Sequence, residues 1–144
     1  MSLLLDANIL LYAKFSDFQQ HEPARCWLDE RLSAPDPLGI PWVSSSAFVR
    51  IATNRRLFAQ PLGTSEAGAQ MVEWSQRRNV WHPEPGQRFG SIFQGLLDEA
   101  QVTGNLVPDA YLGALSIEHG LTVVSSDADF ARFADVRWLN PLRA

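Results

Sequence analysis

The stretch Leu3-Leu4-Leu5-Asp6-Ala7-Asn8-Ile9-Leu10 decides the fold of this chain. A short apolar run closed by an acid is typical of a buried strand that delivers a carboxylate to the carboxyl edge of a sheet, where open α/β folds place their ligand sites. We therefore predict a strand over residues 2–5 and a short helix over residues 8–13. A strand that leads directly into a helix is the opening of an α/β unit.

The rest of the chain continues this alternation of strands and helices. Apolar residues at helical spacing predict a helix over 21–33, which the prolines at 35 and 37 end. The further strands are expected at 38–43, 79–82, 121–124 and 136–139. A helix capped by Ser44 to Ser46 is expected at 47–54, and another is expected to begin at Thr64 or Ser65. The remaining helices are expected at 87–101, 109–119 and 127–133. The pattern predicts one α/β domain over residues 1–144, with a mostly parallel central sheet flanked by helices.

Composition narrows the class of protein. A chain of 144 residues with 46% hydrophobic content has the size of one ordinary domain. No signal-peptide pattern and no apolar stretch of about 18 residues is present, so we expect no membrane span and a cytoplasmic location. The single cysteine, Cys26, excludes an internal disulfide and is interpreted as core or interface packing. The net charge of −4 argues against binding nucleic acid mainly through a bulk positive field.

Three more aspartates stand at the ends of apolar segments, as Asp6 does. Asp109 opens Ala110-Tyr111-Leu112, and Asp127 and Asp129 follow the strand at 121–124. Each has a structural explanation, because acids favour helix starts and Ser126 with Asp129 has the spacing of a capping box. Three strand ends that each carry an acid are nevertheless more than capping requires. With no Cys or His among them, they suit a hard divalent cation such as Mg²⁺ or Mn²⁺.

These motifs resemble those of the PIN domain, and most closely the VapC ribonuclease toxins of bacterial toxin–antitoxin pairs, in the mycobacterial-type subfamily. The resemblance covers nearly the whole chain in order and spacing. The segments that carry it are 5–10, 42–54, 104–110, 125–130 and 137–142.

The resemblance implies an Mg²⁺- or Mn²⁺-dependent endoribonuclease that cuts structured RNA, such as transfer or ribosomal RNA, with a metal-activated water. It implies a type II toxin whose partners are a VapB-type antitoxin and a second copy of itself, for which Trp42 and Trp74 are expected to leave an apolar patch. The residue roles it implies are catalytic for Asp6, Asp109 and Asp127, metal-binding for the same three with Asp129, and supporting for Asn8 and Ser125.

Basic residues supply a candidate surface for RNA or for an acidic antitoxin. We predict that Arg50, Arg55 and Arg56 form it, because a guanidinium binds phosphate or carboxylate through a bidentate fork. The alternative is that they are solvated residues of a helix face.

One departure from the family pattern leaves other functions open. Typical members carry a glutamate in the helix after the second strand, whereas residues 44–50 contain no acid. Either a second metal then binds weakly or Ser46 and water fill the place. A degenerate PIN domain that binds RNA or protein without cutting is the main alternative. A haloacid-dehalogenase-like phosphatase would use Asp6 as nucleophile, but it needs an acid where this chain has Asn8 and a downstream lysine, and the sole lysine is Lys14.

Overall fold

A computed structural model describes residues 2–143 and contains one five-stranded sheet in the order β3-β2-β1-β4-β5. All four strand pairs are parallel, and Leu4 of the central strand β1 lies opposite Gly39 on one side and Val123 on the other. The strands are β1 (Leu3–Leu5), β2 (Leu38–Gly39), β3 (Val80–Trp81), β4 (Thr122–Val124) and β5 (Trp138–Leu139). The predicted α/β class with a mostly parallel sheet is confirmed.

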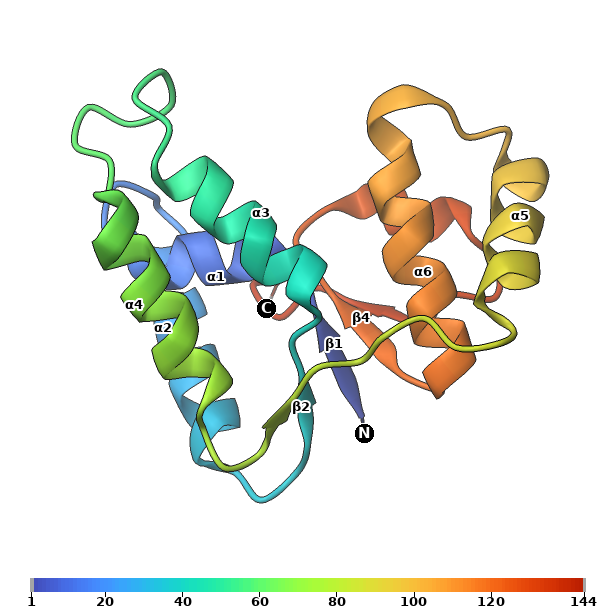
Figure 1. Ribbon diagram of the computed structural model, residues 1–144, viewed down its shortest axis with the longest axis horizontal. Coiled ribbons are helices and arrows are strands. Elements are labelled where there is room, and N and C mark those ends of the chain that lie inside the picture. The colour runs from blue at the N-terminus through green and yellow to red at the C-terminus, as the bar shows by residue number, and fades with distance from the viewer. Residues whose placement is uncertain (1, 144) are drawn as a thin grey trace.

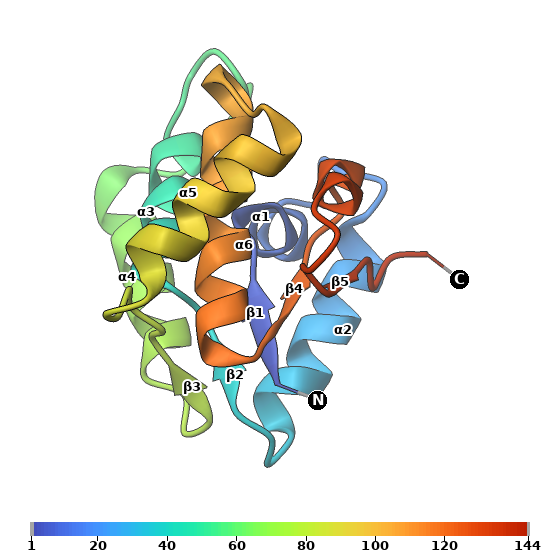
Figure 2. The ribbon, with the colours of Figure 1, turned by 90° about the vertical axis from the view of Figure 1, so that its right-hand side faces the viewer.

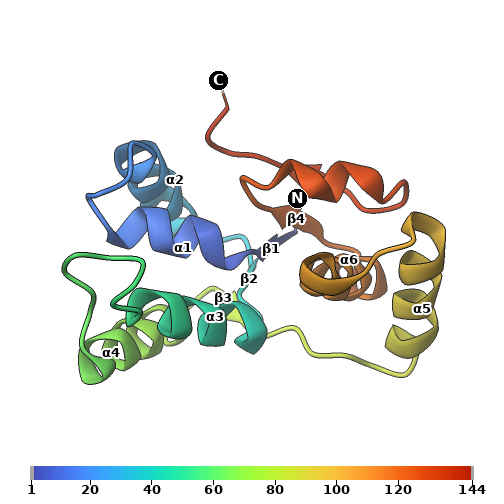
Figure 3. The same cartoon turned by 90° about the horizontal axis from the view of Figure 1, so that it is seen from above.

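Helices cover both faces of this sheet (Figures 1 and 3). Four helices, α1 to α4, lie on one face, and α5 and α6 lie on the other with the last short helical turn η2 (Figure 2). The α-helices are α1 (Ala7–Lys14), α2 (His21–Ser33), α3 (Trp42–Ala52), α4 (Thr64–Ser75), α5 (Phe89–Ala100) and α6 (Val107–His119), and the 3₁₀ turns are η1 (Gly104–Leu106) and η2 (Ala128–Arg132).

The alternation of side chains along β1 divides the core in two. Leu3 and Leu5 pack in the cluster under α1 to α4, whereas Leu4 packs in the cluster under α5 and α6. Burying each such side chain stabilises the fold by roughly 1.5–3 kcal/mol. Because both helical layers pack on the same strand, the end of β1 is held in place from two sides.

The helix after β2 begins earlier than the sequence predicts. The strand ends at Gly39 rather than Val43, and α3 begins at Trp42 with Pro41 as its N-cap, so the serines do not cap it. Ser44 instead lies within the first turn, where its hydroxyl donates to the carbonyl oxygen of Leu5 at 2.7 Å. The prediction of a Thr64 or Ser65 cap for α4 is also wrong, since Gly63 is the N-cap and no side chain bonds there.

The exposure of Cys26, Trp42 and Trp74 differs in part from what the sequence predicts. Cys26 is exposed, so it is no part of the core. Trp74 is buried against Phe48 and offers no apolar patch, whereas Trp42 is 44% exposed. Within residues 2–143, the helices are all too short or too polar to cross a membrane.

Candidate active site

The carboxyl edge of the sheet carries the acidic residues. Asp6 follows β1 and is the N-cap of α1, where its Oδ1 accepts the backbone N–H of Ala7 at 2.7 Å. Asp127 follows β4 and is the N-cap of η2, where its Oδ1 accepts the N–H of Asp129 at 2.9 Å. The helix-start explanation of Asp6 is therefore correct, whereas the capping box of Ser126 with Asp129 is wrong, because Asp127 is the cap. Neither cap uses up the lone pairs of its carboxylate.

Asp109 reaches this edge from a helix and not from a strand end, which corrects the expectation of three acid-bearing strands. It lies in the first turn of α6, whose residues from Ala110 to Ser116 are largely buried against the sheet. The packing of α6 places the carboxylates of Asp109, Asp127 and Asp129 together, with one oxygen from each within 4.8 Å of the others. We call these three the acidic trio.

Asp6 is joined to the acidic trio through the fully buried Ser125. The Ser125 hydroxyl donates to Asp6 Oδ2 at 2.7 Å and accepts the backbone N–H of Asp127 at 3.0 Å. It also accepts Nδ2 of Asn8 at 3.0 Å. One donated and two accepted bonds saturate a hydroxyl, so Ser125 fixes the two strand ends relative to each other. The expected supporting positions of Asn8 and Ser125 agree with these contacts.

The carboxylates repel one another. Burial raises the pKa of Asp109 to about 7, and the charges of Asp127, Asp6 and Asp129 add to the effect. Burial also raises the pKa of Asp6, against the lowering effect of its hydrogen bonds from Ser125 and Ala7, and Asp127 adds a further increase. Negative charge is therefore concentrated here beyond what the protein neutralises, and a bound cation would relieve it.

The donor set fits a hard divalent cation. It contains only carboxylates, together with hydroxyl and amide oxygens nearby, and these are the ligands that Mg²⁺ and Mn²⁺ prefer. No acid comes from α3, in agreement with its sequence, and the α3 residues beside the end of β1 include the buried Ser44 and Ser45. The residues that could hold the ion are thus Asp6 and the acidic trio.

One positive group at this site was missed from the sequence. Arg132 donates from Nη2 to Asp129 Oδ1 at 3.0 Å, and its charge is the one that lowers the pKa of Asp109 against the raising effects. The signal was present, because Asp129 and Arg132 are three residues apart and a helical turn brings such residues to one face.

The predicted basic surface lies elsewhere. Arg50, Arg55 and Arg56 are exposed at the end of α3 and in the loop toward α4, which projects beyond the helices in Figure 1. Salt bridges among residues 2–143 do not involve them. The first turn of α3 contacts the end of β1 through Ser44, whereas Arg50 lies in the last turn of that helix.

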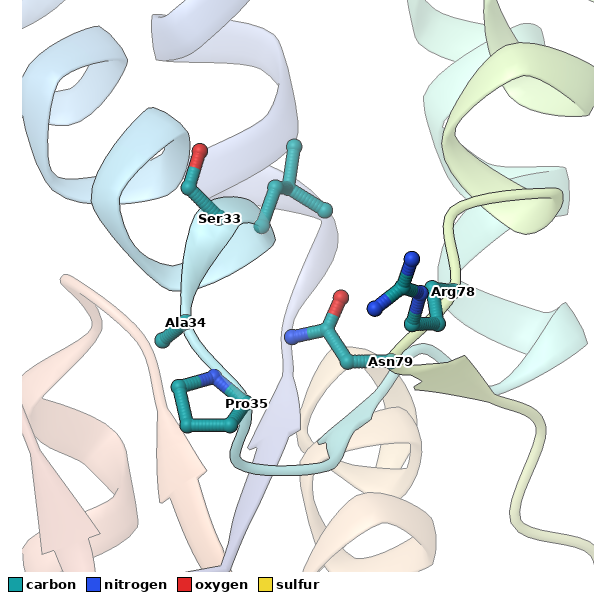
Figure 4. Close-up of a pocket in the computed structure, with 6 residues that line it drawn as sticks. Ser33, Ala34, Pro35, Arg78 and Asn79 are labelled. Atoms are coloured by element: carbon teal, nitrogen blue, oxygen red, sulfur yellow. The ribbon is translucent and has the colours of Figure 1, made fainter.

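A well-formed hollow also lies away from the acids. It has a volume of about 360 Å³ and is lined by the end of α2 and by the residues before β3, among them Pro35, Arg78 and Asn79 (Figure 4). Asn79 donates from Nδ2 to the carbonyl oxygens of Arg31 and Asp36, each at 2.8 Å, so it ties the residues before β3 to the end of α2 and to the loop that follows it. These residues precede strands and therefore mark the amino edge of the sheet.

Comparisons with known proteins agree with this arrangement. The family model for the PIN domain matches residues 3–136. Ribonuclease VapC31 of Mycobacterium tuberculosis is 42% identical over 138 residues, which is 96% of this chain and 97% of the relative. Two solved structures share the fold. VapBC2 from Rickettsia felis, bound to a DNA fragment from its promoter, has a TM-score of 0.71 at 14% identity and covers 97% of this chain and 98% of its own. VapC20 of M. tuberculosis, described as a sarcin–ricin loop cleaving toxin, has a TM-score of 0.63 at 20% identity and covers 94% and 98%.

Proposed function

Because the chain belongs to the PIN domain family, and within it to the VapC ribonucleases, we propose that it is a divalent-metal-dependent endoribonuclease that acts as the toxin of a toxin–antitoxin pair. The observation that carries the metal dependence is the acidic trio, to which Ser125 links Asp6, together with the raised pKa of Asp109. Carboxylates held so close, with Arg132 paired to Asp129 alone, are costly unless a cation occupies the space between them.

The protein's own groups have definable tasks in phosphodiester hydrolysis. Asp6, Asp109 and Asp127 would hold the ion, with Asp129 alongside them. Ser125 and the N–H of Ala7 fix the Asp6 carboxylate so that it need not reorganise when the ion binds. When bound, a divalent ion supplies positive charge to the phosphate and favours ionisation of the attacking water. The absence of an acid from α3 favours one tightly held ion over two.

The substrate and partners proposed for this chain follow from the same family. We propose a structured RNA as substrate, and a VapB-type antitoxin as protein partner. The exposed Arg50, Arg55 and Arg56 are the proposed contacts to RNA phosphates or to antitoxin carboxylates. Replacing all three by glutamine should weaken one of these two complexes and leave Mn²⁺ binding unchanged.

A homodimer is proposed as the assembled form. Trp42 and Val43 are exposed by 44% and 42% at the start of α3 and form an apolar surface that pairing would cover. Light scattering at micromolar concentration measures the mass directly, and a monomer there would contradict this part of the proposal.

A binding module without catalysis is the second candidate function, because α3 contributes no acid. The deciding experiment incubates the purified chain with transfer and ribosomal RNA in Mg²⁺, in Mn²⁺ and in EDTA, and repeats it with Asp109→Asn. Cleavage that needs the cation and Asp109 supports the nuclease. RNA binding with no cleavage under any of these conditions would establish the binding module instead.

A further inference from the structure

Arg132 is held at the edge of the acidic trio by two hydrogen bonds from one residue. Its Nη2 donates to Asp129 Oδ1 at 3.0 Å, and its Nε donates to the backbone oxygen of Asp129 at 3.2 Å. Asp129 itself has a carboxylate oxygen within 4.8 Å of oxygens of Asp109 and Asp127. The guanidinium is therefore one carboxylate away from the proposed ion.

The backbone that carries Arg132 is fixed by the core. Phe130 and Phe133, on either side of it along the chain, are 0% and 1% exposed and pack in the cluster under α5 and α6. Their burial anchors η2 and leaves Asp129 and Arg132 on its outer side. Packing thus fixes the backbone of Arg132, whereas its guanidinium is oriented by the two hydrogen bonds to Asp129.

The outer end of the guanidinium remains available. Arginine has five N–H groups. Among residues 2–143, the recorded hydrogen bonds of Arg132 use only Nε and Nη2, which leaves both N–H groups of Nη1 and a second one on Nη2. The side chain is 36% exposed. Two parallel N–H groups on Nη1 and Nη2 match two oxygens of a phosphate.

The negative charge of the site makes a positive side chain beside it useful for binding phosphate. A polyanion that approaches Asp6 and the acidic trio meets like charge, and the chain as a whole carries a net charge of −4. Arg132 brings a positive charge to the acidic trio through its ion pair with Asp129. A phosphate next to the acids can therefore bind the guanidinium as well as the ion.

We propose that Arg132 binds a phosphate of the RNA substrate beside the bond that is cut, and that Asp129 is the residue that positions it. This inference rests on the proposed nuclease function and adds a specific substrate contact to it. Arg132 acts on RNA and not on the ion, so its loss should affect the two binding reactions differently.

The test compares RNA binding and Mn²⁺ binding in the same variants. Binding of a fluorescently labelled transfer RNA is measured across a range of salt concentrations, with Ca²⁺ in place of Mg²⁺ so that the RNA stays intact. For Arg132→Gln we expect about tenfold weaker binding and a salt slope shallower by roughly 0.7–1, the loss of one phosphate contact. Arg132→Lys should restore the slope but only part of the affinity, because lysine lacks the planar fork.

A matched control is available on α4. Arg77 pairs with Glu73 at 2.6 Å with a similar exposure of 42%, so Arg77→Gln removes the same charge and a comparable ion pair. It should change RNA affinity by less than twofold. Calorimetric titration with Mn²⁺ should give the same or tighter binding for Arg132→Gln, and weaker binding for Asp109→Asn.

The outcomes separate this inference from the function on which it rests. Equal RNA binding by Arg132→Gln and wild type, equal losses in Arg132→Gln and Arg77→Gln, or weaker Mn²⁺ binding by Arg132→Gln would each overturn the role of Arg132 while wild-type cleavage stands. A wild-type protein that neither binds nor cuts RNA would overturn the nuclease and the inference together.

Discussion

The two edges of the sheet differ in what they offer a ligand. The carboxyl edge concentrates Asp6 and the acidic trio in a tightly hydrogen-bonded cluster, and it raises the pKa of two carboxyl groups. The amino edge has hollows of about 360 and 540 Å³ that share Pro35, Arg78 and Asn79 in their lining, and Figure 4 shows the smaller of the two. The comparison teaches that unfavourable charge, rather than empty volume, distinguishes the edge at which we propose the active site.

The largest expected effect is on cleavage at the carboxyl edge. Asp109→Asn and Asp6→Asn should each lower the rate of RNA cleavage by about 100-fold or more, because each removes a charged ligand. Asparagine is preferred to alanine at position 6, since Asp6 caps α1 and an alanine there would also cost about 1 kcal/mol of stability. The rate is measured with excess RNA and saturating Mn²⁺.

The amino edge supplies the matched control for that substitution. Asn79→Ala removes two hydrogen bonds, to the end of α2 and to the loop after it, and should destabilise the fold by about 1–3 kcal/mol while leaving the cleavage rate within twofold. If Asn79→Ala abolished cleavage in folded protein, the functional distinction between the edges would be lost.

The next effect is stabilisation by the cation. Mn²⁺ at about 100 times its Kd should raise the free energy of unfolding of wild type by about 2.7 kcal/mol, which corresponds to a Tm increase of roughly 5–10 °C. Asp109→Asn should show a much smaller shift, whereas Asn79→Ala should show the full one. Equal shifts in wild type and Asp109→Asn would remove the acidic cluster as the binding place.

Removal of the Ser125 hydroxyl should have an intermediate effect on Mn²⁺ affinity. Ser125→Ala deprives Asp6 Oδ2, Asn8 Nδ2 and the N–H of Asp127 of a common partner, so Mn²⁺ affinity should fall about tenfold. Calorimetry gives the affinity, and Ser116→Ala serves as control because its buried hydroxyl bonds only within α6, to Gly113. Unchanged Mn²⁺ affinity in Ser125→Ala would show that Asp6 needs no such support.

The smallest effect is a pH dependence of stability in EDTA. The pKa of Asp109 rises from the ordinary 3.8 to about 7 on folding, so the folded chain binds more protons than the unfolded chain between these values. The free energy of unfolding should therefore fall as pH rises through this window, by about 1 kcal/mol after allowance for solvent screening. Melting curves at pH 5 and pH 8 measure it, and Asp109→Asn should reduce the difference. A Tm difference of the same size in the variant would assign the effect to other groups.

The order of elements was predictable because each depends on local pattern. The apolar runs at 3–5 and 122–124 form the two paired central strands, and the helix expected over 21–33 has those bounds. The start of α3 was not predictable in the same way. Serines favour cap positions, but Pro41 is the N-cap of α3. The Ser44 hydroxyl instead donates to the carbonyl oxygen of Leu5, which lies in a strand far away in the sequence.

The site was predictable as a set of residues but not as a geometry. Asp6 and Asp127 follow strands as the sequence indicates, whereas Asp109 joins them only because α6 packs across the sheet. Asp129 belongs to the acidic trio and also pairs with Arg132. Both contacts depend on the turn η2, which places Asp129 and Arg132 side by side. Long-range packing of this kind leaves no periodic signal in the chain.

The strand order has a consequence for the timing of synthesis. The chain leaves the ribosome from its N-terminus, so β1 and Asp6 emerge first. The neighbour that completes their surroundings, β4, begins only at Thr122, and the hydroxyl that fixes Asp6 comes 119 residues after it. An unfinished chain therefore carries Asp6 without Ser125 or Asp127, so the proposed site is not assembled until β4 and the residues that follow it have been made.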